Sequence, residues 1–169
     1  MQLSLCVNGR SAAPWSKGGI AHGDVLLLSR PLGTGVLFAA AMAGACQPEA
    51  LDTVLQHMCR SQHRLLDQLE PHHQAIHACT DVTGFGLLGH LGEMLASSSP
   101  LRVTLWANRI PAYPEAMDRF GQGYASSLAP ANRRSWQLLD GPIHLDEEPS
   151  QALLELLVDP QTCGPLLLA

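Results

Sequence analysis

Residues 80–86 hold the groups in this sequence that are best suited to bind a metal ion or a phosphate. They combine one carboxylate, Asp81, with two hydroxyls, Thr80 and Thr83, and two glycines, and a helical pattern follows directly. Asp81 could bind Mg²⁺, because a hard cation takes carboxylate oxygen and usually shares it with substrate phosphates. Hydroxyls and glycine amides at a helix N-terminus could hold phosphate oxygens or water. The alternative is that Asp81 or Thr83 caps the following helix, and these residues alone leave both interpretations open.

A second turn, residues 30–35, follows an apolar run and precedes another helical pattern. Its glycines, Gly33 and Gly35, would let the backbone amides around Thr34 face an anion, and the helix dipole would favour that charge. Arg30 could add a charge-assisted contact to phosphate. The spacing matches neither a Walker loop nor the dinucleotide fingerprint. A tight strand-to-helix turn without a ligand is the competing interpretation.

A third turn, residues 159–165, contains an acid, Asp159, and a hydroxyl, Thr162, between an expected helix and an expected strand. An ordinary connection with Gly164 as its flexible point is the simpler interpretation.

The cysteines and histidines give little sign of a metal or nucleophile site. Zinc sites use paired ligands at short spacing, and this sequence has no Cys-x-x-Cys. Cys79 and Cys163 adjoin two of the turns, and buried, inert thiols are the default expectation. The histidines are expected on the surface, with His90 on one face of the helix after residue 86. The Gly-x-Ser-x-Gly pattern of serine hydrolases is absent.

Hydrophobic periodicity predicts the elements that position these turns. Residues 25–28 are continuously apolar and suit a buried strand, and residues 48–69 form the clearest amphipathic helix. Because the order is not a strict β-α-β repeat, we expect an α+β fold, or α/β sandwich, in which a mixed β-sheet packs with helices. The other expected strands cover residues 3–7, 75–79, 101–105 and 166–168, and the other expected helices cover residues 36–46, 87–96, 115–120 and 151–158.

The composition limits the possible functions. A length of 169 residues suits one domain with a real core. With 46% hydrophobic and only 15% charged residues, we expect a partner domain or subunit to cover part of the surface. The net charge of −5 argues against nucleic acid as the main ligand. No apolar run approaches the ~20 residues of a membrane span, and no signal peptide is visible. Five scattered cysteines indicate reduced thiols in the cytoplasm.

Taken together, residues 23–35, 78–90 and 159–162 resemble the selenophosphate synthetase (selenide, water dikinase) family. The resemblance covers residues 1–169 but only the family's second half, a C-terminal domain like that of aminoimidazole ribonucleotide synthetase. It implies the conversion of ATP, selenide and water to selenophosphate, AMP and phosphate. It also implies that an absent N-terminal domain supplies most ATP and metal contacts and forms a homodimer. Both ends of the chain therefore look cut, and this domain alone should be inactive.

The resemblance also implies roles for individual residues. Asp81 would be a Mg²⁺ ligand, and residues 33–35 and 80–84, including Thr80, Thr83 and Gly84, would line the shared site near the phosphates of ATP. No catalytic residue would lie in this chain. The family usually has Lys at the position of Arg30, and Lys and Arg hold phosphate differently. It also has Ser and a second Gly around Gly164, where this chain has Pro165, which removes a backbone amide.

Two other hypotheses fit the same motifs. One is a related ATP-dependent synthetase or maturation enzyme of the same superfamily. The other is a degenerate domain that acts as a scaffold without catalysis, for which the apolar composition and Pro165 are arguments.

Overall fold

Two small β-sheets and the helices around them form the chain. The computed structural model describes residues 4, 6, 8–11, 13–98 and 100–169. In the first sheet, strand β5 (Leu166–Leu168) lies between β1 (Leu27–Leu28) and β2 (Cys79–Asp81) and is antiparallel to both. In the second, β3 (Val103–Leu105) and β4 (Ile143–Leu145) are parallel. The strand expected from Leu3, Leu5 and Val7 falls on residues outside the described ones.

Seven helices are described, together with shorter 3₁₀ turns, and the expected α+β class is confirmed. Parallel and antiparallel pairing occur in separate sheets within the described part of the chain. The α-helices are α1 (Thr34–Met42), α2 (Pro48–Cys59), α3 (His63–Leu69), α4 (Gly86–Ala96), α5 (Ala116–Gly121), α6 (Ala129–Asn132) and α7 (Gln151–Val158), and the 3₁₀ turns are Glu70–Ala75, Ala107–Arg109 and Arg133–Asp140.

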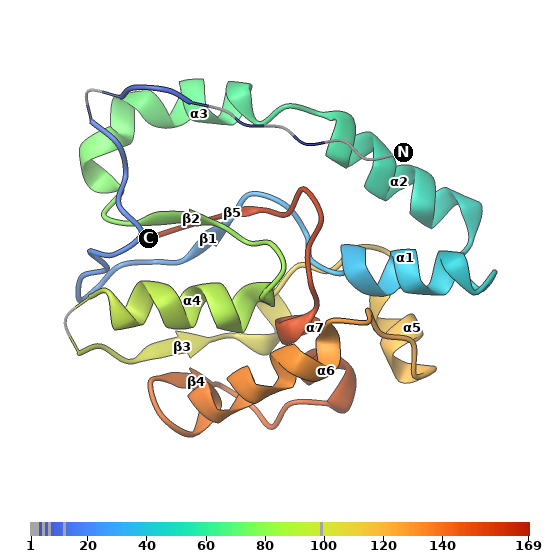
Figure 1. Ribbon diagram of the computed structural model, residues 1–169. Helices are drawn as coiled ribbons and strands as arrows, with labels where there is room; N and C mark the ends of the chain where they lie inside the picture. Colours follow the sequence, from blue (N-terminus) through green and yellow to red (C-terminus); the bar gives the residue numbers. More distant parts are fainter. Residues whose placement is uncertain (1–3, 5, 7, 12, 99) are drawn as a thin grey trace.

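Helix α4 forms the centre of the core. It runs between the three-stranded sheet and strand β3 (Figure 1). Its side chains Leu87, Leu88, Leu91 and Met94 are buried, because the helix is apolar on most of its circumference and has neighbours on several sides. Each buried side chain of this kind stabilises the fold by about 1.5–3 kcal/mol. The helix positions the turn at residues 80–86, which leads directly into it.

The single amphipathic helix expected over residues 48–69 is wrong. The helix is interrupted between α2 and α3, where the backbone of Arg60 adopts an extended conformation. The Arg60 carbonyl accepts a hydrogen bond from Arg30, and the side chain of Gln62 bonds to Ser29. These contacts reach the segment from elsewhere in the sequence, so the local pattern carries no sign of them.

Two expected strands differ from the structure. The apolar run at residues 25–28 is paired only at its end, and Val25 and Leu27 are 66% and 56% exposed, so it is not a buried strand. Its outer face has no described element packed over it. Strand β2 begins at Cys79 rather than at residue 75, and it includes Thr80 and Asp81. Asp81 therefore stands at the end of a strand and not within a loop.

Candidate functional site

The three turns singled out in the sequence meet in space. The Gln161 amide donates to the Thr83 carbonyl at 2.9 Å, and the Val82 amide donates to the Pro165 carbonyl at 2.8 Å. The Thr162 amide donates to the Thr34 hydroxyl at 2.9 Å. Main-chain and side-chain bonds thus join all three turns into one unit, although the first and third are more than a hundred residues apart in sequence.

The turn at residues 30–35 leads into helix α1, and the backbone amides of Gly33, Thr34 and Gly35 at the start of the helix already donate hydrogen bonds within the protein. Gly33 has a φ of 111°, a left-handed conformation that suits glycine. The Gly33 and Thr34 amides and the Thr34 hydroxyl all donate to Oε1 of Gln161, at 3.1, 3.3 and 3.2 Å. The Gly35 amide donates to Oδ2 of Asp159 at 2.9 Å. The expectation that these amides face a ligand is therefore wrong, because side chains of the third turn occupy them.

Asp159 is fully buried at the N-terminus of α1. Besides the Gly35 amide, its Oδ2 accepts a bond from Nε2 of Gln161 at 3.0 Å. Its Oδ1 has no hydrogen-bond partner among the described residues. Burial raises the pKa of Asp159 to about 7, and the backbone amides of α1 and the Gln161 amide oppose that rise. The third turn is therefore more than a plain connection, since it supplies the cap of α1.

Sequence reasoning missed this capping role of Asp159 and Gln161. An acid and an amide in one turn are a usable signal for a cap. Their partner helix, however, lies far away in the sequence, so periodicity does not identify it.

Arg30 ties the first turn to two other segments. Its guanidinium donates to the Cys163 carbonyl at 3.0 Å and to the Arg60 carbonyl. No carboxylate in the described part of the chain forms an ion pair with it, so its positive charge stays available beside the three turns.

The turn at residues 80–86 does not cap helix α4 with a side chain. The N-cap residue is Phe85, and no side-chain bond caps the helix, so the capping interpretation of Asp81 and Thr83 is wrong. Asp81 is exposed, and its carboxylate has no hydrogen bond or ion pair with any described residue. Thr80 is buried, with its hydroxyl 3.4 Å from the Asp81 carbonyl. Asn132 holds the Gly84 carbonyl at 2.7 Å and so fixes this end of the turn.

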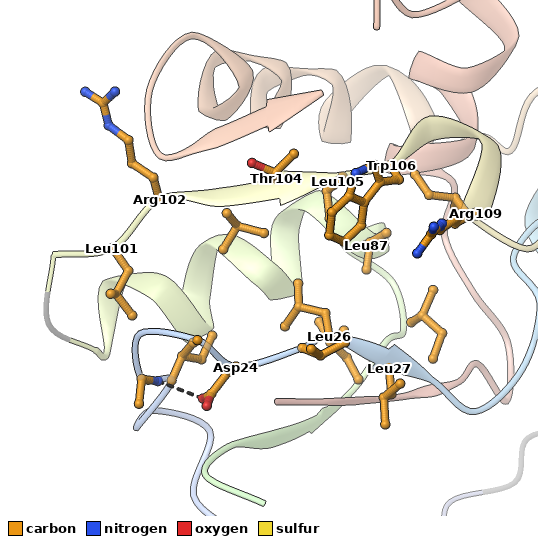
Figure 2. Close-up of a pocket in the computed structure, with 18 of the residues that line it drawn as sticks. Asp24, Leu26, Leu27, Leu87, Leu101, Arg102, Thr104, Leu105, Trp106 and Arg109 are labelled. Carbon is orange, nitrogen blue, oxygen red and sulfur yellow. Dashed lines mark hydrogen bonds between the residues drawn. The ribbon is translucent and has the colours of Figure 1, made fainter. Parts of the chain in front are cut away.

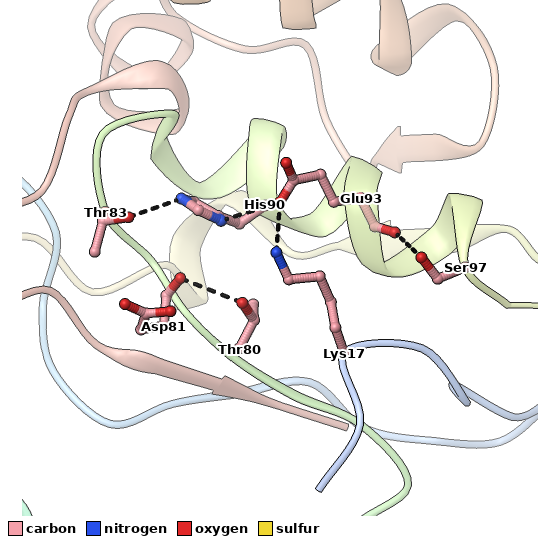
Figure 3. Close-up of polar contacts among 7 residues, drawn as sticks. All are labelled: Lys17, Thr80, Asp81, Thr83, His90, Glu93 and Ser97. Carbon is pink, nitrogen blue, oxygen red and sulfur yellow. Dashed lines mark hydrogen bonds and ion pairs between the residues drawn. The ribbon is translucent and has the colours of Figure 1, made fainter. Parts of the chain in front are cut away.

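Thr83 contacts a residue that the sequence placed only on a helix face. Its Oγ1 lies 3.2 Å from Nε2 of His90, which is 5% exposed (Figure 3). On the other side of the ring, Nδ1 lies 3.4 Å from Glu93, which pairs with Lys17 at 2.8 Å. Thr83 and His90 are seven residues apart, a spacing that could have suggested proximity if the helix had been extended backwards.

The two cysteines beside the turns differ. Burial raises the pKa of the Cys79 thiol, with a further contribution from the Asp81 charge, as expected of an inert thiol. Cys163 is exposed, so its expected burial is wrong. Its backbone is in the left-handed region, with a φ of 48°. All five cysteines are free.

The candidate site could supply Mg²⁺ with one carboxylate ligand, that of Asp81, and the remaining ligands would come from elsewhere. Within the described ranges, no cluster of three or more His, Cys, Asp or Glu side chains could hold a metal ion. Mg²⁺ commonly keeps several waters and takes one or two carboxylates together with substrate phosphates. An exposed, unpaired Asp81 suits that mode of binding.

A separate apolar groove lies between β1 and β3 (Figure 2). It has a volume of about 730 Å³, and none of the predicted site residues lines it. Val25 and Leu27 form part of one wall, and Trp106, with the Arg109 guanidinium 5.2 Å from its ring centre, lies on the other. The groove is an exposed apolar surface, and the covering partner expected from the apolar composition stays a prediction.

No helix in the described residues is both long and apolar enough to cross a membrane.

Comparison with known proteins identifies similar chains. The family model described as AIR synthase related protein, C-terminal domain, matches residues 21–132. A selenide, water dikinase of Desulfitobacterium hafniense (strain DSM 10664 / DCB-2) is 34% identical over 170 residues, which cover 99% of this chain and 48% of that protein. The selenide, water dikinase of Photorhabdus laumondii is 39% identical over 147 residues, 87% of this chain and 40% of that protein. The chain spans about half the length, or less, of these curated relatives.

Proposed function

Because the chain belongs to the AIR synthase related protein family, as a C-terminal domain, we propose that it is the C-terminal domain of an ATP-dependent selenophosphate synthetase. The whole protein would convert ATP, selenide and water to selenophosphate, AMP and phosphate. The observation that carries this proposal is the 34% identity to a selenide, water dikinase across 99% of the chain. That match runs through all three of the turns that meet at the site.

We propose that Asp81 supplies a carboxylate ligand to Mg²⁺ and that Thr83 and Gly84 line the phosphates of ATP beside it. When bound, the ion would neutralise charge on the transferred phosphoryl group. Arg30 would add a positive charge nearby. Thr80 is buried, so its part would be to fix the end of β2. Gly33, Thr34 and Gly35 would line the site by their shape, since their amides are bonded to the third turn.

The proposed partners follow from the length of the relatives. An N-terminal domain of the same protein would supply most ATP contacts and the catalytic nucleophile, and it would form the homodimer. The exposed apolar groove supports the presence of a covering element. Because the chain spans about half the length, or less, of these relatives and the nucleophile would lie in the other half, this domain would be inactive alone. Five free cysteines support a cytoplasmic location.

The test is Asp81→Asn in the whole protein, with selenide-dependent formation of AMP from ATP as the measurement. We expect a loss of roughly 100-fold, because the amide keeps the shape of the carboxylate but removes its charge, and changes around a metal ligand alone cost 10–100-fold. The matched control is Asp52→Asn, the same change at an exposed acid on α2, and it should leave the rate unchanged.

Two outcomes would reject the proposal. Unchanged activity in Asp81→Asn would favour a non-catalytic scaffold, an alternative supported by the internally bonded amides of the first turn. ATP turnover that does not depend on selenide would favour a related synthetase of the same family.

A further inference from the structure

His90 is a buried imidazole in direct contact with the candidate site. Its Nε2 lies 3.2 Å from Oγ1 of Thr83, and no other described group donates to that hydroxyl oxygen. The ring of Phe85 packs against the imidazole, with ring centres 5.7 Å apart. The hydroxyl of Thr83 and the imidazole therefore determine each other's hydrogen-bonding direction.

The opposite nitrogen of His90 faces a carboxylate. Nδ1 lies 3.4 Å from Oε2 of Glu93, at ion-pair distance but without the geometry of a hydrogen bond. Lys17 lies 2.8 Å from the same oxygen, and its hydrogen bond holds the pKa of Glu93 below the ordinary value (Figure 3). Glu93 is therefore a carboxylate at neutral pH. A carboxylate beside one ring nitrogen favours the tautomer with the proton on that nitrogen.

This tautomer fixes the role of Thr83. With the proton on Nδ1, Nε2 carries a lone pair and accepts a hydrogen bond. Thr83 must then donate its hydroxyl proton to His90, and the lone pairs of its oxygen are left for another partner. The oxygen of Thr83 is then free to accept a hydrogen bond. Thr83 is two positions along the sequence from Asp81, whose carboxylate is exposed.

Building on the proposed function, we propose that His90 is a positioning residue that orients the Thr83 oxygen as an acceptor toward the water shell of a Mg²⁺ ion bound at Asp81. The Lys17–Glu93 ion pair sets the His90 tautomer from the far side of the ring. Burial lowers the pKa of His90, and this keeps the imidazole neutral so that Nε2 can accept. The Lys17–Glu93 ion pair links the segment before residue 21 to the site. This segment lies outside the region that the family model matches, residues 21–132.

Imidazole ¹⁵N NMR on the full chain tests the tautomer without any ligand. We expect the resonances of His90 to show a protonated Nδ1 and an unprotonated Nε2. Thr83→Val should shift the Nε2 resonance, and Thr83→Ser should restore it. Glu93→Ala should move the population toward the other tautomer. The matched control is Asp67→Ala, which removes the acid 3.6 Å from the exposed His63 and should leave His90 unchanged.

Mn²⁺ binding to the whole protein with ATP, followed by electron paramagnetic resonance, tests the link to the site. We expect His90→Leu to weaken Mn²⁺ binding about 10-fold or more, as loss of a group that orients a ligand does. His90→Gln should recover most of the affinity, because its amide oxygen can accept from Thr83. In a Thr83→Val background, His90→Leu should cause no further loss, since the two residues act through one contact.

A protonated Nε2 in the wild-type chain would overturn the proposal, since Thr83 would then be the acceptor. An equal loss of Mn²⁺ affinity from His90→Leu with and without Thr83 would also overturn it and would indicate a purely structural role. Failure of the proposed function is distinguishable, because then Asp81→Asn would bind Mn²⁺ as well as the wild type does. If His90→Leu does not fold, the tautomer and the Thr83 variants still decide.

Discussion

At the scale of single residues, two carboxylates beside the three turns have opposite surroundings. Asp81 ends an edge strand, is exposed, and accepts no hydrogen bond from a described residue. Asp159 is fully buried and bonded to the first turn of α1. An exposed acid keeps its charge at little cost and can bind a cation, whereas burial penalises the charged form of an acid. The first is therefore suited to a ligand and the second to the fold.

The raised pKa of Asp159 predicts a pH dependence of stability. The native state binds more protons than the unfolded state between the ordinary pKa of 3.8 and the folded value of about 7. The stabilising contribution is therefore fully present below pH 4 and is lost as the pH rises through 7, by at most about 1.4 kcal/mol per pH unit. In Asp159→Asn this loss should disappear, because the amide does not titrate.

Urea unfolding of the wild type and Asp159→Asn at several pH values between 4 and 8 measures this difference. Asp67→Asn, at an exposed position on α3, is the matched control and should keep the wild-type slope. Equal slopes in the wild type and Asp159→Asn would show that Asp159 titrates alike in both states.

At the scale of elements, the start of helix α1 depends on one side chain from the third turn. Oε1 of Gln161 accepts bonds from the Gly33 and Thr34 amides and from the Thr34 hydroxyl, all in buried surroundings. Gln161→Ala should cost about 2–4 kcal/mol, since loss of a cap costs about 1 and buried unsatisfied donors add 1–3. Gln56→Ala, on the exposed face of α2, should change stability by less than about 0.5 kcal/mol.

Thermal or denaturant unfolding gives the comparison between these two glutamine variants. A Gln161→Ala variant as stable as Gln56→Ala would mean that water replaces the glutamine oxygen at the helix start. Amide hydrogen exchange at Gly33 and Thr34 would then be faster in the variant than in the wild type, where both amides donate to Gln161.

The local sequence predicted those elements whose pattern is complete within one segment. Helix α7 and strand β5 match their expected residues, 151–158 and 166–168, and α4 differs by one residue, because the apolar pattern and its end signals lie inside each segment. The break between α2 and α3 was missed because contacts from Arg30 and Ser29, distant in sequence, determine it. The same holds for the candidate site: features encoded within one segment were predicted, and those set by contacts distant in sequence were missed.

The composition of the three turns was visible from the sequence, and the family resemblance implied that residues 33–35 and 80–84 line one site. The sequence did not show which backbone amides of these turns stay free of hydrogen bonds. The Gly33 and Gly35 amides have the local signature of an anion site, yet Gln161 and Asp159 occupy them from about 125 residues away. The partner of Thr83 was also missed, because His90 looks like any polar residue on a mostly apolar helix until the packing against Phe85 is known.

At the scale of the whole molecule, three of the exposed apolar side chains gather at one groove. Val25, Leu27 and Trp106 all line the groove between β1 and β3 and are about half exposed or more. Isolated apolar residues on a surface are ordinary, but a contiguous apolar hollow is typical of a surface that binds a partner or a ligand. β1 and β3 each pair on one side only within the described sheets, so both walls of the groove are sheet edges.

The groove predicts that the isolated chain binds a hydrophobic dye such as ANS while it is folded. Replacing Val25 and Leu27 by Thr should lower the dye fluorescence by roughly half, since these two side chains make up much of the exposed apolar wall. Leu128→Thr is the matched control, because Leu128 is 54% exposed but lies outside the groove. Dye binding by the whole protein should be weaker than by the chain alone if the rest of the polypeptide covers this surface. Equal fluorescence in the double variant and the Leu128 control would show that the groove is closed in solution, and the apolar composition would then need another explanation.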